Sequence, residues 1–364
     1  MNYYILPKNN NTFDIDPSIQ KNMLTPYTSH SLYYSYKNLT NENFFLFESK
    51  LYEDIIKIIN PYEFIFSKIP GTKLSVSKLP SQCNIFYDIL EIVHTLNIID
   101  SFQNKNIKSL HITPNYASTI ESIEILRENN MDKHNGISHF NLKDNTEDTF
   151  DLIFYEVNNL NNNSNINEYI FGVLTILKII LKSQISNGSC IIKISMLFHK
   201  PIIDIIYILS SLYEKVYIIK PNTSNIVSYD KYIVCKTFIL NEKVSIHYEK
   251  YYNQITKFFN QMNTLHNSNN DGFIQNIIKN NLPCYFINKI DDINIITGQQ
   301  QLEYTNQLIN ILKNKNRDVK LENIKKINIQ KCIHWCEKYS IPCNKYIEKS
   351  NIFLTNVNEN EEEI

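Results

Sequence analysis

The stretch from Asp151 to Phe238 decides the fold class. In order, it reads Asp151-Leu-Ile-Phe-Tyr-Glu156, an apolar segment at 171–182, Asn187-Gly-Ser-Cys-Ile-Ile-Lys193, a second apolar segment at 201–213, Val216-Tyr-Ile-Ile-Lys-Pro221 and Tyr229-Asp-Lys-Tyr-Ile-Val-Cys-Lys236. Strand-length apolar runs that alternate with helices of about a dozen residues indicate crossover connections and a largely parallel sheet. The sequence therefore predicts a Rossmann-like α/β sheet with helices on both faces, closed by a β-hairpin.

Composition bounds the class of protein. The chain has 364 residues, enough for one large domain or two, and only 6 of them are glycine. The formal net charge is −1, which gives no global electrostatic case for nucleic-acid binding, so any such surface has to be local. The 7 cysteines are an odd number and scattered, which indicates reduced thiols and an intracellular, cytoplasmic location.

Three regions follow from the patterning along the chain. Residues 1–84 are expected to form an irregular N-terminal arm over 1–30 followed by a helix over 44–59, and residues 85–240 form the α/β domain. Residues 241–364 are expected to be a helical extension with an acidic tail. Its expected helices are 245–262, 273–280, 298–315 and 327–339. Neither a signal-peptide layout nor an uncharged apolar run of 18 residues is present, so we expect no membrane association.

Lys193 ends its expected strand, Lys220-Pro221 is followed by Ser224, and the next strand opens with Ser228-Tyr-Asp230. This order of elements and residues resembles the FtsJ-like (RrmJ-type) RNA 2′-O-methyltransferases, especially the cap methyltransferases of large DNA viruses. The resemblance is strong from 151 to 238 and weak elsewhere. It implies S-adenosylmethionine as cofactor, RNA such as an mRNA cap as substrate, and a location in the host cytoplasm or the virion if the protein is viral.

The family carries a Lys-Asp-Lys-Glu tetrad that controls the pKa of one lysine, which activates the ribose 2′-hydroxyl. The resemblance places Lys193 at the central lysine, Glu156 at the aspartate and Asp230 at the glutamate. The first lysine of the family aligns with Asp88. Three of the four positions are therefore altered, each carboxylate by one methylene and the lysine by a reversal of charge.

The cofactor motif of the family is an acidic residue followed by a Pro-Gly-Gly-like turn after the first strand. The matching residues here are Thr113, Pro114, Asn115 and Tyr116, after a short strand at 109–112. Asn tolerates positive φ better than most residues, whereas Tyr adds bulk where the ligand would lie. If Tyr116 fills that space, its ring should pack against the strand ends near Ile112 and Phe154. Asp144 is the candidate for holding the cofactor ribose.

Two functions from different classes remain open on these residues. One is methyl transfer to RNA with Lys193 as the activating base, tuned by Glu156 and Asp230. The other is a catalytically inactive methyltransferase-fold scaffold that binds RNA or stabilises a partner protein. A third reading, zinc bound by the cysteines around His334, is disfavoured because helical spacing puts those side chains on different faces.

Overall fold

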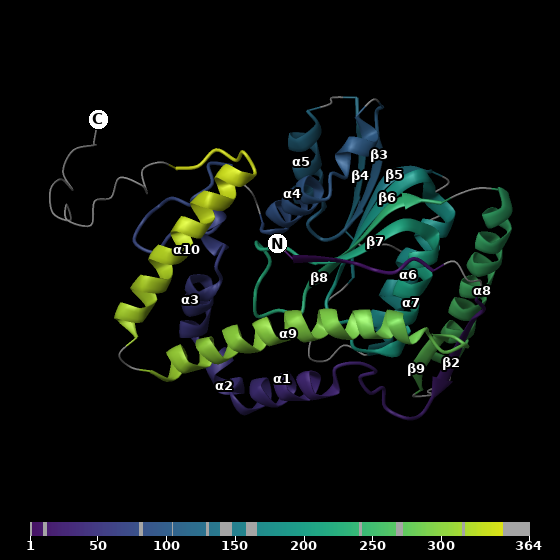
Figure 1. Ribbon diagram of the computed structural model, residues 1–364, viewed down its shortest axis with the longest axis horizontal. Helices are drawn as coiled ribbons and strands as arrows, with labels where there is room; N and C mark the ends of the chain where they lie inside the picture. Colours follow the sequence, from purple (N-terminus) through teal and green to yellow (C-terminus); the bar gives the residue numbers. More distant parts are fainter. Residues whose placement is uncertain are drawn as a thin grey trace.

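The computed structural model describes residues 2–9, 13–79, 83–103, 105–128, 131–138, 148–157, 166–239, 242–266, 272–314 and 317–344. Its centre is a seven-stranded sheet with strand order β1-β7-β8-β6-β5-β3-β4 (Figure 1). The strands are β1 (Asn2–Ile5), β3 (Lys108–Ile112), β4 (Lys133–Ile137), β5 (Phe150–Glu156), β6 (Gln184–Ile194), β7 (Tyr213–Lys220) and β8 (Lys231–Phe238). The expected Rossmann-like α/β architecture is confirmed.

The pairing of the strands places the ends of β3, β5 and β6 at one edge of this sheet. β4, β3, β5 and β6 run parallel to one another, whereas β8 is antiparallel to both β6 and β7. The β7–β8 pair is the hairpin expected from the sequence. In an open sheet of this kind ligands bind at the carboxyl ends of the parallel strands. That edge here contains Ile112, Glu156 and Ile194.

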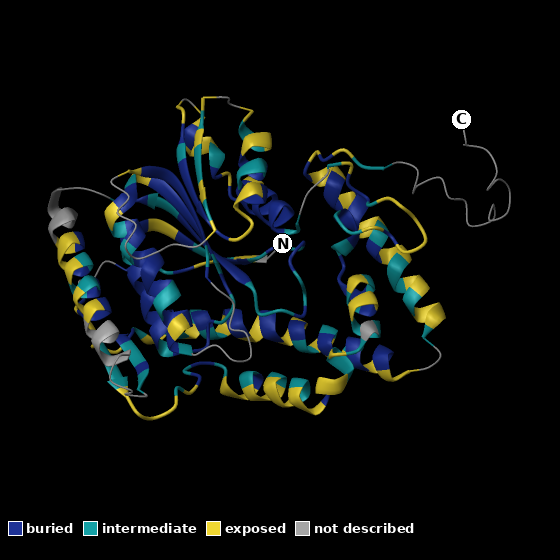
Figure 2. Cartoon of the chain, turned by 180° about the vertical axis from the view of Figure 1, so that it is seen from behind, coloured by how far each residue is buried: buried dark blue, intermediate teal, exposed yellow. Residues whose placement is uncertain are grey.

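Helices cover both faces of the sheet, so its strands are apolar throughout rather than alternating. Leu152 and Phe154 of β5 pack with α4 (Ile85–Thr95) and α5 (Tyr116–Arg127). The intervening Ile153 and Tyr155 pack with α6 (Ile166–Ser183) and α7 (Lys200–Leu212). Figure 2 shows the resulting buried sheet between helices whose outer faces are exposed. A short 3-10 helix, η2 (Ile99–Phe102), follows α4.

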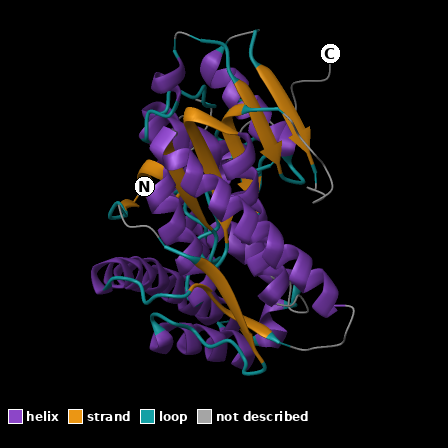
Figure 3. Cartoon of the chain, turned by 90° about the vertical axis from the view of Figure 1, so that its right-hand side faces the viewer, coloured by secondary structure: helices purple, strands orange, loops and turns teal. Residues whose placement is uncertain are grey.

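The remaining elements surround this core. β2 (Ile15–Gln20) and β9 (Phe273–Ile278) form a separate two-stranded sheet, visible apart from the large sheet in Figure 3. α8 (Glu242–His266) packs on α6, and the long α9 (Cys284–Lys313) runs beneath the sheet beside α1 (His30–Glu42). A second body at the far end of α9 contains α2 (Phe44–Phe47), α3 (Lys50–Ile59), η1 (Glu63–Ile65) and α10 (Asp318–Lys338).

Several local expectations are wrong, and the reasons are long-range. The first 30 residues are not irregular throughout, because β1 joins the edge of the large sheet and β2 pairs with β9. The segment 273–280, expected to be helical, contains β9, whose Ile277 and Ile278 N–H groups donate to the buried Asp204 carboxylate. The expected helix over 44–59 is broken at Ser49, which caps α3 by accepting from Tyr52 N–H.

Candidate functional site

The candidate site lies where β5, β6 and β8 present side chains on the face covered by α4. Strand register aligns Glu156 with Lys193 and Lys193 with Tyr232. Asp88 projects from α4 into the same place, where the Tyr232 hydroxyl donates to its Oδ2 at 2.8 Å. Four elements distant in sequence therefore meet at this edge.

Lys193 and Glu156 form an ion pair at the mouth of the site. The Lys193 Nζ donates to Glu156 Oε1 at 2.7 Å, and the two side chains are 16% and 12% exposed. The other oxygen of Glu156 accepts a hydrogen bond from the Thr113 hydroxyl. The predicted central lysine thus touches the predicted carboxylate, and Thr113, which follows β3, is hydrogen-bonded to that carboxylate.

Asp230, which directly precedes β8, is a second carboxylate near Lys193. Its Oδ1 accepts from the Ser195 hydroxyl at 3.0 Å. Burial alone would lower the pKa of Lys193, but the carboxylates of Glu156, Asp230 and Asp88 outweigh it and raise that pKa above its ordinary value. Lys193 is consequently held as an ammonium ion near neutral pH.

Asp88 is buried and has only neutral hydrogen-bond donors. The hydroxyls of Thr223 and Tyr232 donate to its two oxygens. Burial raises the pKa of Asp88 to about 6, against the opposing effects of Thr223, Lys193 and Tyr232. Asp88 thus adds a third carboxylate to the surroundings of Lys193.

Glu91 is a buried carboxylate of this region that the sequence reasoning missed. It lies one turn after Asp88 on α4 and accepts from Asn222 N–H at 3.0 Å and from the Trp335 indole N–H at 3.2 Å. Burial raises the pKa of Glu91 to about 7. The sequence did carry a signal for Glu91, because it is an acidic residue within the mostly apolar segment Ile85–Leu96. A buried helix does not tolerate such a carboxylate without hydrogen-bond partners.

Two further lysines lie under the site, and sequence reasoning gave neither a role in the chemistry. The Lys220 Nζ donates to the backbone carbonyls of Ser228 and Asp230, and burial lowers its pKa to about 8. Lys231 is 2% exposed, and burial lowers its pKa to about 7. Both lysines therefore brace the turn between β7 and β8, which includes Ser224 and Asn225.

The expected cofactor turn is exposed and regular. Thr113 is buried, whereas Pro114, Asn115 and Tyr116 are exposed and lead directly into α5. Asn115 has φ −104°, so the turn needs no left-handed residue. Asp144 lies outside the described residues.

Tyr116 does not plug this edge, so that expectation is wrong. Its side chain remains 39% exposed, and its ring lies over Gly136 of β4. A Cβ at position 136 would lie 2.1 Å from Tyr116 Cδ2, so the close approach depends on glycine there. The tyrosine is thus turned toward the neighbouring strand and leaves the start of α5 accessible.

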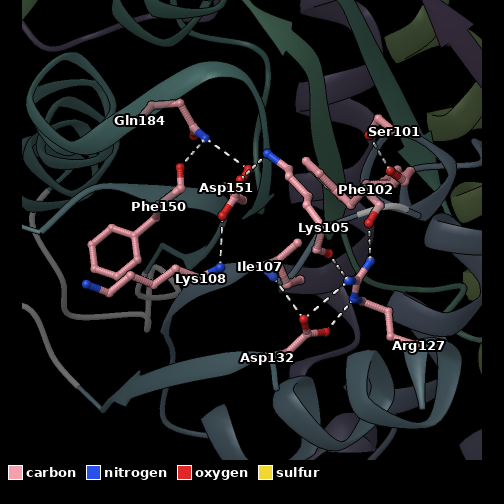
Figure 4. A network of polar contacts seen from close by, with 11 residues as sticks. Ser101, Phe102, Lys105, Ile107, Lys108, Arg127, Asp132, Phe150, Asp151 and Gln184 are labelled. Atoms are coloured by element: carbon pink, nitrogen blue, oxygen red, sulfur yellow. Dashed lines mark hydrogen bonds and ion pairs between the residues drawn. The ribbon is translucent and has the colours of Figure 1, made fainter. Parts of the chain in front are cut away.

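A cavity of about 420 Å³ lies at the opposite edge of the domain, where α4 and α5 end. It is lined in part by Val93, His94, Leu126 and Arg127. Figure 4 shows that the Arg127 guanidinium is already engaged by Asp132 and by the carbonyls of Phe102 and Lys105. This cavity is distant from the carboxyl strand ends, so we do not assign the chemistry to it.

No protein-family model and no curated protein sequence matches this chain. None of the helices in the described residues combines the length and the hydropathy needed to cross a membrane. Cys332 and Cys336 are buried while the neighbouring His334 side chain is 82% exposed, so these three side chains point in different directions.

Proposed function

We propose that this chain is an FtsJ-like, S-adenosylmethionine-dependent RNA 2′-O-methyltransferase or a divergent relative of one, with an mRNA cap as the substrate class. One observation carries the proposal: Lys193, Glu156, Asp230 and Asp88 converge from four elements at the carboxyl edge of the parallel strands. A lone lysine at a strand end is ordinarily a solvated side chain. A lysine acted on by three carboxylates in this location is typical of a site where pKa values are tuned.

The arrangement around the turn at 113–116 is compatible with a methyl donor. Thr113, Pro114 and Asn115 would hold the cofactor beside the first turn of α5, and Tyr116 does not block the approach. When bound, S-adenosylmethionine supplies an electrophilic methyl group. The chain itself supplies Lys193, which would orient the ribose 2′-hydroxyl and accept its proton once deprotonated. Glu156, fixed by Thr113, keeps the lysine in place.

The raised pKa of Lys193 sets the pH dependence of this reaction. A lysine held as an ammonium ion can donate a hydrogen bond but cannot accept a proton, so the fraction in the free-base form is small near neutral pH. Methyl transfer should therefore rise with pH well into the alkaline range. A rate that is flat from neutral to alkaline pH would contradict Lys193 as the base.

Calorimetric titration of the purified protein with S-adenosylmethionine, followed by transfer of labelled methyl to capped RNA, tests the proposal. We expect binding, and we expect Lys193→Ala to abolish transfer while leaving cofactor affinity nearly unchanged. Lys236→Ala is the matched control, because Lys236 lies on β8 but donates to the Leu96 carbonyl at the other end of the strand. No binding heat at millimolar ligand would remove the enzymatic proposal.

A second candidate function is favoured by one specific observation. Asp88 replaces the family's first lysine and helps to raise the pKa of Lys193, which is the reverse of what base catalysis needs. The alternative is a catalytically inactive scaffold that binds RNA or a partner protein. Absence of methyl transfer at every pH, together with retained RNA or partner binding, would favour it over the enzyme.

A further inference from the structure

Charge is distributed unevenly over the chain. Residues 50–79 and 317–344, which we call the basic arm, contain eleven Lys or Arg and six Asp or Glu, a net charge of +5. The whole chain has a net charge of −1, so the remainder carries −6. The arm therefore provides the local basic surface that a chain of this composition needs in order to bind a polyanion.

The two segments of the basic arm form one packed body. Phe64 and Val76 share a buried cluster with Cys332 and Trp335. Backbone hydrogen bonds join the same segments, since Lys78 N–H donates to the Pro342 carbonyl and Asn344 N–H donates to the Val76 carbonyl, each at 2.8 Å. The lysines of the arm are consequently presented from a fixed surface rather than from a free chain.

Eight lysines of the arm are exposed and, within the described residues, form no ion pair. Three lie in the loop that follows η1, four lie on α10 and one lies on α3. They are Lys57, Lys68, Lys73, Lys78, Lys320, Lys326, Lys331 and Lys338. The basic cluster at the amino end of the sheet differs, because Asp151 pairs with Lys105 and Asp132 pairs with Arg127 (Figure 4). Lys108 of the same cluster pairs with Asp148. The cations of that cluster are thus already paired with carboxylates, whereas these lysines of the arm are not.

The arm also adjoins the candidate site. Trp335 of α10 donates to Glu91 of α4, and Glu91 accepts from the backbone of Asn222 in the turn that leads to Asp230. A strand held on the arm would therefore lie beside the helix that carries Asp88. From this position and from the free charges we propose that the basic arm binds the phosphate backbone of single-stranded RNA and delivers it to Lys193. The choice of RNA as the polyanion rests on the proposed function.

Phosphate contact without base readout is the form of recognition that this surface supports. Lysines bind phosphates as point charges and carry no sequence information. The exposed large apolar side chains of the arm are Leu74, Val319 and Ile327, none of them an aromatic platform on which bases could stack. We therefore expect binding that depends strongly on salt and weakly on sequence.

The test is fluorescence anisotropy of a labelled, unstructured RNA of about 20 nucleotides, titrated with the full chain at salt concentrations from about 50 to 200 mM. The variant Lys68→Gln/Lys73→Gln/Lys78→Gln removes three charges from the loop. The control Lys21→Gln/Lys257→Gln/Lys279→Gln removes three exposed lysines from β9 and its surroundings, with the same change in net charge. A second variant, Lys320→Gln/Lys326→Gln/Lys331→Gln, tests α10 separately.

Each phosphate contact adds about −0.7 to the slope of log affinity against log salt for single strands, so losing three should reduce the slope by about 2. At about 0.1 M salt the affinity should fall on the order of ten- to a hundredfold. The control should bind as the wild type does. Equal losses of affinity in the loop variant and in the control, or no loss in the loop variant, would overturn the inference. So would tighter binding to phosphatidylserine vesicles than to RNA.

The outcomes separate this inference from the proposed function. If the wild type methylates RNA while the arm variants keep the wild-type KM for RNA, the arm inference fails and the enzyme stands. If the wild type binds no S-adenosylmethionine but binds RNA through the arm, the enzymatic proposal fails and the arm inference stands.

Discussion

At the scale of single residues, the site is governed by which charges face Lys193. The lysine contacts Glu156 directly, and Asp230 and Asp88 act on it at longer range. All three raise its pKa, so the site as built favours the ammonium form. Asp88 is the one carboxylate of the three that is fully buried on α4 and accepts hydrogen bonds only from hydroxyls among the described residues, so its replacement tests the charge on Lys193 directly.

Asp88→Asn should shift the pH profile of methyl transfer toward lower pH. The amide keeps an oxygen that can accept from Tyr232 or Thr223, but it removes a negative charge that raises the pKa of Lys193. Initial rates measured from neutral to alkaline pH report the shift. Asp291→Asn is the control, since Asp291 lies on α9 and accepts from Ser29. A profile that moves to higher pH in Asp88→Asn would contradict this account of the site.

Lys231 should make the stability of the protein depend on pH. The unfolded chain keeps this lysine protonated up to about pH 10.4, whereas burial lowers its pKa in the folded protein to about 7. The unfolded state binds more protons across that window, so this lysine's contribution to the free energy of unfolding rises with pH, by up to about 1.4 kcal/mol per unit.

The variant Lys231→Met should therefore be most stable, relative to the wild type, at the acidic end of the window, with the difference shrinking as pH rises. Urea unfolding at several values between about pH 7 and 9 measures that difference. Lys133→Met changes an exposed lysine on β4 and should give a difference that does not vary with pH. A constant difference for Lys231→Met as well would show that the buried amine is not neutral in the folded state.

At the scale of elements, α4 connects the candidate site to the C-terminal helix. Asp88 and Glu91 are one turn apart and face the same turn after β7, and Glu91 also accepts from Trp335 on α10. Burial raises the pKa of Glu91 to about 7, so its ionisation falls in the neutral range. The strength of the contact between α4 and α10 should therefore vary near neutral pH, because a charged acceptor forms the stronger hydrogen bond.

Tryptophan fluorescence can follow this contact because the chain has 1 Trp. Emission of Trp335 should change with a midpoint near pH 7, and Glu91→Gln should abolish the change. The neighbouring His334 is exposed and directly precedes Trp335 in the sequence. His334→Gln therefore serves as the control, and the midpoint should survive in it. Loss of the transition in His334→Gln, with retention in Glu91→Gln, would assign the signal to the histidine instead.

Among the strands, those of the parallel sheet that the sequence predicted correctly are largely buried. β5 and the apolar core of β6 are apolar on both faces because helices cover both faces, and that pattern is readable locally. The helix prediction for 273–280 was wrong because Phe273-Ile-Gln-Asn-Ile-Ile278 suits a helix as well as a strand. The strand conformation of β9 depends on its pairing with β2, about 250 residues away in sequence.

The candidate site was predictable in part for the same reason. The pattern located the strand ends at which Lys193, Glu156 and Asp230 stand, whereas the choice of these residues and of Asp88 as site residues came from the resemblance. The structure brings the four into one region. Glu91 and Lys231 were missed because their role comes from burial against Trp335 and against the β7–β8 turn, neither of which is local in sequence. The orientation of Tyr116 depends on the absence of a Cβ at Gly136, a contact between β4 and α5.

At the scale of the whole molecule, α9 joins the sheet to the basic arm. Near its start, Phe286, Ile290 and Ile293 belong to the core cluster of the large sheet. Toward its end, Leu308 and Ile311 pack with Ile55 and Ile59 of α3. A rigid helix that belongs to two cores should couple their unfolding, so that the arm and the sheet melt together.

Coincident thermal transitions by Trp335 fluorescence, which reports the arm, and by far-UV circular dichroism, which reports the whole chain, would show this coupling. Ile311→Ala should lower both midpoints together, because removing a buried isoleucine costs about 2–5 kcal/mol. Ile327→Ala is the matched control, since Ile327 is 56% exposed on α10 and its loss should cost no more than about 0.5 kcal/mol. If Ile311→Ala lowers the fluorescence midpoint alone, the arm is a separate folding unit, and α9 is a tether rather than a shared core element.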